Sequence, residues 1–174
     1  MSEHHEQSHG IDTAEHLAEH LAEVLTARSV IVCVGNDLCG DDGAGPAVAA
    51  AVEGKVPWEV FDVRGVPENF IVKIVEAAPD TVLLVDALSF DAPPGAVELL
   101  AGESITGQGP STHGPAPVAF LDLLNMMHPC RRVVLGVQPV TGDFGEPMTD
   151  PVKSGVDLIV RGLLLAGQAA GAGG

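Results

Sequence analysis

Aromatic and basic residues are scarce in this chain of 174 residues. Aromatic side chains make up 3% of the sequence and tyrosine is absent, so the chain lacks the stacking platforms that bind single-stranded nucleic acids. Only 8 Lys and Arg stand against 24 Asp and Glu, which gives a formal net charge of −16. Because a charge of that sign repels phosphate backbones and anionic lipids, we expect neither a nucleic acid nor a membrane surface as partner.

Cysteine is scarce as well. Cys33, Cys39 and Cys130 fit neither a disulfide framework nor a zinc-ligand pair, so we expect a reducing compartment and predict a cytoplasmic location. No apolar stretch reaches the roughly 18 residues of a membrane span. The acidic start of the chain has neither the basic nor the apolar region of a secretory signal.

Apolar residues are abundant, at 46%, and they fall into two alternating patterns. Runs rich in β-branched residues predict five strands, at 29–35, 58–65, 81–87, 96–102 and 131–139. Segments with helical periodicity predict helices at 12–27, 46–53, 67–79, 116–127 and 150–167. This alternation predicts an α/β fold, with a mostly parallel sheet of about five strands and helices on both faces.

The length is that of a single domain. We expect residues 1–28 to form a partly helical N-terminal extension, residues 29–168 the folded domain, and residues 169–174 a flexible tail. The extension could pack as an extra helix, shield a surface, or loosely hold a metal ion through its histidines.

Five of the seven histidines lie in the first 20 residues. His16 and His20 share one face of the helix predicted at 12–27, where Asp12 and Glu15 resemble a capping box. The two histidines could bind a metal ion weakly. A solvated helix face is the simpler interpretation, because no third ligand is spaced with them.

A glycine-rich loop, GNDLCGDDGAGP at 35–46, follows the first predicted strand. It matches neither the GxGxxG nor the GK[ST] phosphate-binding pattern. Its adjacent carboxylates, Asp41 and Asp42, would also repel a phosphate. We expect one of them to cap the following helix, where the dipole favours a negative charge, and the other to point into the crevice at the sheet edge.

Two further residues could carry chemistry. Asp86 ends the third predicted strand, where a charge is costly unless it is paired or bound to a cation; a hydrogen-bonded structural carboxylate is the alternative. His113 lies in a loop rich in Gly and Pro, and a histidine without a role is the alternative there. Ligands of open parallel sheets bind beyond the carboxyl ends of the strands, so the fold would bring both residues toward Asp42.

Together, Asp42, Asp86 and His113 would form a set of two carboxylates and one imidazole. Such a set suits a borderline divalent ion with open coordination positions. Neither a GxSxG motif nor a recognisable Cys–His signature is present, so we assign no separate nucleophile.

The ordered motifs resemble the endopeptidases that mature NiFe hydrogenases, most closely the type that processes formate-hydrogenlyase and related large subunits. The matching segments are VGNDLCGDDGAGP (34–46), VPENF (66–70), TVLLVDA (81–87), STHGPAP (111–117), LGVQP (135–139) and PMTDPV (147–152). The resemblance implies an α/β/α sandwich on a five-stranded sheet, in agreement with the alternation of strands and helices, and it implies a peptide hydrolase.

The resemblance also implies a substrate and a metal. The substrate would be the precursor of a hydrogenase large subunit, whose C-terminal extension is removed once nickel is in place. Asp42, Asp86 and His113 match the family's ligands for a nickel ion that arrives with the substrate, so no tightly bound cofactor is expected. Catalysis would run through that ion, and whether Asp41 acts as a base stays open.

Two other functions compete with the protease. A non-catalytic protein that checks the precursor for nickel would use the same ligands. A nucleoside phosphorylase would need basic residues near the strand ends, whereas only Arg64 and the pair Arg131 and Arg132 lie close to strands. An acidic crevice rim disfavours phosphate binding.

Overall fold

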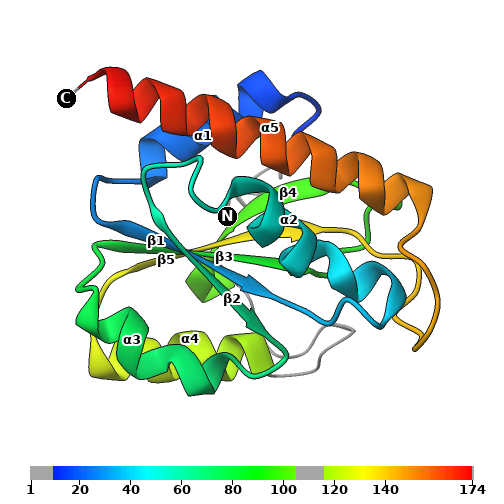
Figure 1. Cartoon of the computed structure of the whole chain (residues 1–174), viewed down its shortest axis with the longest axis horizontal. Coiled ribbons are helices and arrows are strands. Elements are labelled where there is room, and N and C mark those ends of the chain that lie inside the picture. Colours follow the sequence, from blue (N-terminus) through cyan, green and yellow to red (C-terminus); the bar gives the residue numbers. More distant parts are fainter. Residues whose placement is uncertain (1–9, 105–115, 174) are drawn as a thin grey trace, which may run out of the picture.

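The computed structural model describes residues 10–104 and 116–173. Its centre is one five-stranded sheet in the order β2-β1-β3-β5-β4 (Figure 1). The strands are β1 (Ser29–Val34), β2 (Glu59–Arg64), β3 (Thr81–Ala87), β4 (Val97–Ala101) and β5 (Arg131–Val137). All neighbours run parallel except β4, which pairs antiparallel with β5 at one edge. The predicted mostly parallel sheet is confirmed.

Helices cover both faces of this sheet. On one face lie α1 (Ala14–Val24), α2 (Ala44–Val52) and α5 (Asp150–Ala172), and on the other lie α3 (Ile71–Glu76) and α4 (Ala116–Met127) (Figure 1). Every residue of β1 and of β3 is buried, which explains their continuous apolar runs. Two hydrophobic clusters result, one on each face, and they confirm the sandwich.

The helix near the N-terminus joins the first of these clusters. Leu17 and Leu21 of α1 are fully buried, and a Cβ atom at Gly162 of α5 would lie 2.6 Å from Cδ2 of Leu17. The two helices therefore pack closely, as an extra helix on the sandwich would. The predicted capping box is wrong, because α1 begins at Ala14 and the side chain of Thr13 accepts the hydrogen bond from the His16 N–H.

The last helix is longer than the sequence pattern suggests. Helix α5 continues through Ala172, whereas a flexible tail is expected from residue 169. Alanine and glutamine are good helix formers. The small and polar residues at the end of α5 therefore stay helical although none of their side chains packs into the core. By length and composition α5 is also long and apolar enough to cross a membrane. Its apolar stripe, however, packs into the core beside α1 and α2.

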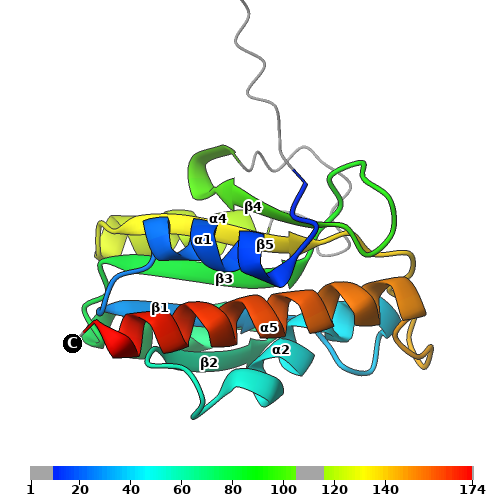
Figure 2. The same cartoon turned by 90° about the horizontal axis from the view of Figure 1, so that it is seen from above.

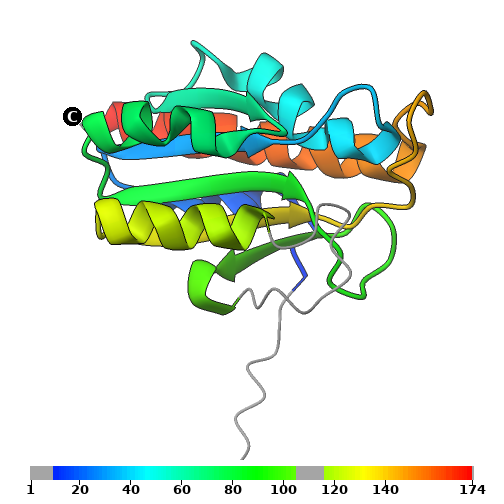
Figure 3. The same ribbon diagram turned by 90° about the horizontal axis from the view of Figure 1, so that it is seen from below.

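The carboxyl ends of the four parallel strands meet at one edge of the sheet. The loop after β1 and the loop after β5 lie side by side there (Figures 2 and 3). Backbone hydrogen bonds join these loops, from the Gly40 N–H to the Glu146 carbonyl (3.0 Å) and from the Gly145 N–H to the Leu38 carbonyl (2.8 Å). This edge is where an open α/β sheet binds its ligand.

Candidate active site at the carboxyl edge of the sheet

Two glycines allow the loop after β1 to pack closely against the end of that strand. A Cβ atom at Gly35, whose φ is +143°, would lie 2.0 Å from the Asp42 carbonyl oxygen. A Cβ atom at Gly45 would lie 1.9 Å from the Val34 carbonyl oxygen. Only glycine fits at such approaches. The glycine-rich loop thus packs a short 3-10 helix, η1 (Gly40–Gly43), and the start of α2 against the sheet.

Asp41, in η1, binds the loop after β5. Its Oδ2 accepts hydrogen bonds from the N–H groups of Val140 (2.8 Å) and Thr141 (3.1 Å) and from the Thr149 hydroxyl (3.1 Å). Its Oδ1 accepts one from the Thr149 N–H (2.7 Å). The expected helix cap is therefore wrong: in the described chain no side chain caps η1 or α2, and this carboxylate joins two loops instead.

These hydrogen bonds determine the protonation of Asp41. Burial alone would raise the pKa of its carboxyl group, but the donors from Thr149, Val140 and Thr141 outweigh that effect and lower the pKa below its ordinary value. Hydrogen bonds to the charged form of a carboxyl group favour ionisation. Asp41 is consequently a fixed anion with its lone pairs engaged, which makes it a poor general base.

Asp42 and Asp86 lie together at the ends of different elements. Asp42 follows Asp41 in η1 and is 4% exposed, and its Oδ2 accepts a hydrogen bond from the Asn36 N–H (3.0 Å). Asp86, near the end of β3, is 1% exposed. The charge of Asp42 acts on Asp86, so the structure brings these two predicted site residues together, as the fold argument expects.

The environment of Asp86 is unfavourable for a negative charge. Burial raises the pKa of its carboxyl group well above the ordinary value, the charge of Asp42 raises it further, and the Ala87 N–H offsets this only in part. Neither Asp86 oxygen has a hydrogen-bond partner of normal geometry among the described residues. A buried carboxylate in this situation is stabilised by a cation.

The third predicted ligand, His113, lies outside the described residues. Within residues 10–104 and 116–173, no group of three or more His, Cys, Asp or Glu is arranged to hold a metal ion. Helix α4, which starts at Ala116, begins at the same edge of the sheet as the two carboxylates (Figure 3). The described part of the site therefore supplies two oxygen-ligand side chains, and the imidazole stays a prediction.

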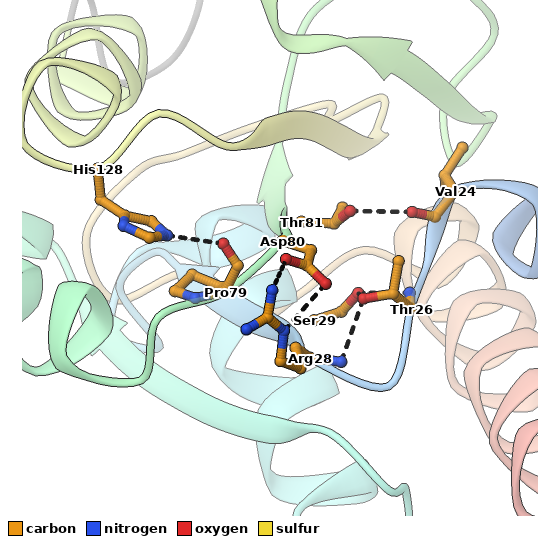
Figure 4. Close-up of polar contacts among 8 residues, drawn as sticks. All are labelled: Val24, Thr26, Arg28, Ser29, Pro79, Asp80, Thr81 and His128. Atoms are coloured by element: carbon orange, nitrogen blue, oxygen red, sulfur yellow. Dashed lines mark hydrogen bonds and ion pairs between the residues drawn. The ribbon is translucent and has the colours of Figure 1, made fainter. Parts of the chain in front are cut away.

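The other described histidine outside α1 lies at the opposite edge of the sheet. The Nε2 atom of His128 donates a hydrogen bond to the Pro79 carbonyl oxygen (2.8 Å), beside the ion pair of Arg28 and Asp80 (Figure 4). These contacts hold the amino ends of the strands together. His128 is a structural residue.

A buried glutamine that the sequence motifs do not single out positions the loop after β3. Gln138 follows β5, and its Oε1 accepts hydrogen bonds from the N–H groups of Phe90 (2.9 Å) and Ala92 (3.3 Å). Its Nε2 donates to the Ser89 hydroxyl (3.3 Å). The segment directly after Asp86 is thus fixed from β5. A polar side chain placed just after a buried strand is the sequence signal that could have indicated this role.

An acidic cleft of about 330 Å³ adjoins η1. Its charged lining residues are Asp37, Asp62, Arg64 and Glu146. Arg64 forms ion pairs with Asp37 (2.6 Å) and Asp62 (2.9 Å), so its charge is already matched by carboxylates. A phosphate would find no unpaired cation among the lining residues, which argues against a nucleoside phosphorylase.

Apolar side chains are exposed beside the same loops. Leu38 is 59% exposed, Val140 57% and Phe144 78%. Leu38 belongs to the loop after β1, and the other two belong to the loop after β5, which Asp41 binds. We call Leu38, Val140 and Phe144 the apolar rim. Exposed apolar groups gathered near a site are typical of surfaces that bind another protein.

Comparisons with known proteins agree with this architecture. A family model described as hydrogenase maturation protease (HycI) matches residues 44–165. The hydrogenase 3 maturation protease of Escherichia coli K12 is 36% identical over 137 residues, which cover 77% of this chain and 87% of that protein.

Solved structures give the same result. The solution structure of the endopeptidase HycI from Escherichia coli has a TM-score of 0.70 at 33% identity, covering 84% of this chain and 91% of that one. HycI from Thermococcus kodakarensis, a NiFe hydrogenase maturation protease, has a TM-score of 0.70 at 23% identity, covering 84% and 98%, and shows the shared fold. The chain therefore belongs to the hydrogenase maturation protease family of peptide hydrolases.

Proposed function

We propose that this protease removes the C-terminal extension of a NiFe hydrogenase large-subunit precursor, and that it selects the precursor by the nickel ion it carries. The observation that carries the proposal is the buried carboxyl group of Asp86, which has no hydrogen-bond donor of normal geometry among the described residues and lies under the negative charge of Asp42. Two ionised carboxylates that lie close together in a buried position repel each other. A divalent cation bound between them removes this repulsion.

In this proposal nickel enters as part of the substrate. Asp42 and Asp86 would supply oxygen ligands, and His113 would supply an imidazole ligand. Carboxylate and imidazole groups both bind borderline divalent ions. The nickel ion of a bound substrate would cancel the repulsion between the two carboxylates. A precursor without nickel would lack this favourable contribution to the binding free energy. Selection for the loaded precursor follows from that electrostatic difference.

The bound ion would then serve the hydrolysis. A divalent ion either polarises the scissile carbonyl group or lowers the pKa of a bound water. Asp41 is set aside as the base, because its four hydrogen bonds keep it anionic and occupied. Its role in the proposal is to hold η1, and with it Asp42, against the loop after β5.

The surface around the site suits a protein substrate. The apolar rim would contact apolar residues of the precursor, while the acidic cleft would attract a basic segment of its C-terminal extension. Opposite charges accelerate association and fix orientation. A cytoplasmic location is part of the proposal, supported by three cysteines that are all free thiols and so compatible with a reducing compartment.

Incubation with the purified precursor tests the proposal. We expect mass spectrometry to show loss of the C-terminal extension from nickel-loaded precursor and no loss from nickel-free precursor. Equal cleavage of both forms would contradict nickel selection. Nickel-dependent binding without a change in mass would instead identify the non-catalytic checkpoint protein.

A further inference from the structure

Two histidines of α1 lie in direct contact with each other. His16 and His20 are both partly buried, their Nε2 atoms are 2.9 Å apart, and their ring centroids are 4.6 Å apart. Residues four apart on a helix lie on the same face one turn from each other. The proposed protease site uses neither residue.

The backbone that carries these rings is well fixed. Leu17 and Leu21, each next in sequence to one of the histidines, are fully buried in the core. The Thr13 side chain accepts the hydrogen bond from the His16 N–H at the start of the helix (3.1 Å). Because the helix is held along its buried side, the two imidazoles face each other without an ordering cost for the main chain.

The distance between the two nitrogens matches a particular coordination geometry. Metal–imidazole bonds are roughly 2.0–2.1 Å long, so two nitrogens at an angle of about 90° lie about 2.8–3.0 Å apart, while a tetrahedral angle gives about 3.3–3.4 Å. Angles of about 90° belong to square-planar and octahedral ions. The observed 2.9 Å is the length of an ordinary hydrogen bond and is also compatible with the 90° angle, so the rings would need little movement to bind Ni²⁺ or Cu²⁺.

The surrounding charge favours a cation. Helix α1 contains Glu15, Glu19 and Glu23, and the first 27 residues of the chain contain no Lys or Arg. Negative side chains nearby raise the local concentration of cations. The alternative is a hydrogen bond in which one neutral ring donates to the other, a contact that depends on the tautomers.

We propose that His16 and His20 form a second metal site, a two-histidine chelate for a divalent ion of square-planar or octahedral preference, with Ni²⁺ as the probe. Within the part of the chain that the structure describes, no third His, Cys, Asp or Glu joins the pair, so the proposal assigns two protein ligands. Two protein ligands make a site from which the ion exchanges readily. This proposal is independent of the proposed protease function, because it needs neither Asp42 nor Asp86.

The test uses the full chain with His4, His5 and His9 replaced by alanine, so that only the helical pair differs between samples. Isothermal titration with Ni²⁺ compares this parent with the variant His20→Ala. A matched control, His20→Ala combined with Ala22→His, keeps the number of histidines but moves one to another face of α1.

We expect the parent to bind one Ni²⁺ at the helical pair, and to bind Zn²⁺ more weakly there. The variant and the control should each bind that Ni²⁺ at least tenfold more weakly. Hydrogen exchange in α1 should slow on addition of Ni²⁺ in the parent alone. Unchanged affinity in His20→Ala, or equal affinity of the control and the parent, would overturn the proposal.

Discussion

Thr149 donates two hydrogen bonds to Asp41 across 108 residues of sequence, one from its N–H to Oδ1 (2.7 Å) and one from its hydroxyl to Oδ2 (3.1 Å). The same carboxylate also receives the Val140 and Thr141 N–H groups. One side chain in η1 therefore fixes both ends of the loop after β5. Because Asp42 is the next residue, this contact also positions the candidate ligand.

The variant Asp41→Asn should lose much of this stabilisation. Hydrogen bonds to a charged group contribute roughly 1.5–3 kcal/mol each, and they are not additive, so we expect a loss of about 2–4 kcal/mol in the free energy of unfolding. Urea denaturation measures it. The control Asp143→Asn changes an exposed carboxylate of the same loop that accepts a hydrogen bond from the Thr141 hydroxyl (3.1 Å). An asparagine oxygen can still accept this bond, so the control should cost less than about 1 kcal/mol. Equal losses in the two variants would refute the role given to Asp41.

The pH dependence of stability should report the same residue. Since the pKa of Asp41 is lowered in the folded state, its contribution is present above the ordinary aspartate pKa and is lost as the pH falls through the folded value. The wild-type protein should therefore lose stability more steeply on acidification than Asp41→Asn. Parallel acid-unfolding curves of the two proteins would argue against this contribution.

The contribution of Asp86 to stability should depend on pH in the opposite direction. Its folded-state pKa is raised, so its favourable contribution exists below the ordinary aspartate pKa and disappears as the pH rises through the folded value. We expect Asp86→Asn to raise the thermal midpoint at pH 7 while it abolishes precursor processing. Asp157→Asn, on an exposed position of α5, should change neither quantity. A destabilised Asp86→Asn at pH 7 would show that a further group in the protein stabilises the charge of Asp86.

The apolar rim should matter for substrate binding and not for folding. Full burial of a Phe side chain contributes about 1.5–3 kcal/mol, which corresponds to about a 10–100-fold loss of kcat/KM in Phe144→Ser, mainly through KM. Met126→Ser replaces another exposed apolar residue, 82% exposed on α4, and serves as the control. Equal kinetic effects of the two substitutions would remove the rim from the docking surface.

Gly45, at the start of α2, has no room for a larger side chain. In Gly45→Ala the new Cβ would lie 1.9 Å from the Val34 carbonyl oxygen, and backbone must shift to relieve it. We expect a loss of at least about 2 kcal/mol in the free energy of unfolding. Gly171→Ala in α5, where nothing lies within 4 Å, should be neutral or slightly stabilising. Similar stabilities of both variants would contradict the tight packing of η1 and α2 on β1.

The sheet could be predicted from the sequence because its central strands are buried on both faces. That burial gives the continuous apolar runs of β1 and β3, and parallel strands necessarily bring Asp42 and Asp86 toward one edge. The role of Asp41 could not be predicted, because its donors lie about 100 residues away in sequence and both acids look alike locally. The cap at Thr13 is ambiguous from the sequence, because Asp12, one residue earlier, is an equally good cap by type.

If the buried acids recognise the nickel-loaded precursor, its processing should depend on Asp42. The most direct measurement is a mass-spectrometric time course of that precursor with the wild-type protein, with Asp42→Ala, and with Asp157→Ala, which changes an exposed residue of α5. We expect complete removal of the extension by the wild type and by Asp157→Ala, and none by a folded Asp42→Ala. Processing at the wild-type rate by Asp42→Ala would contradict it.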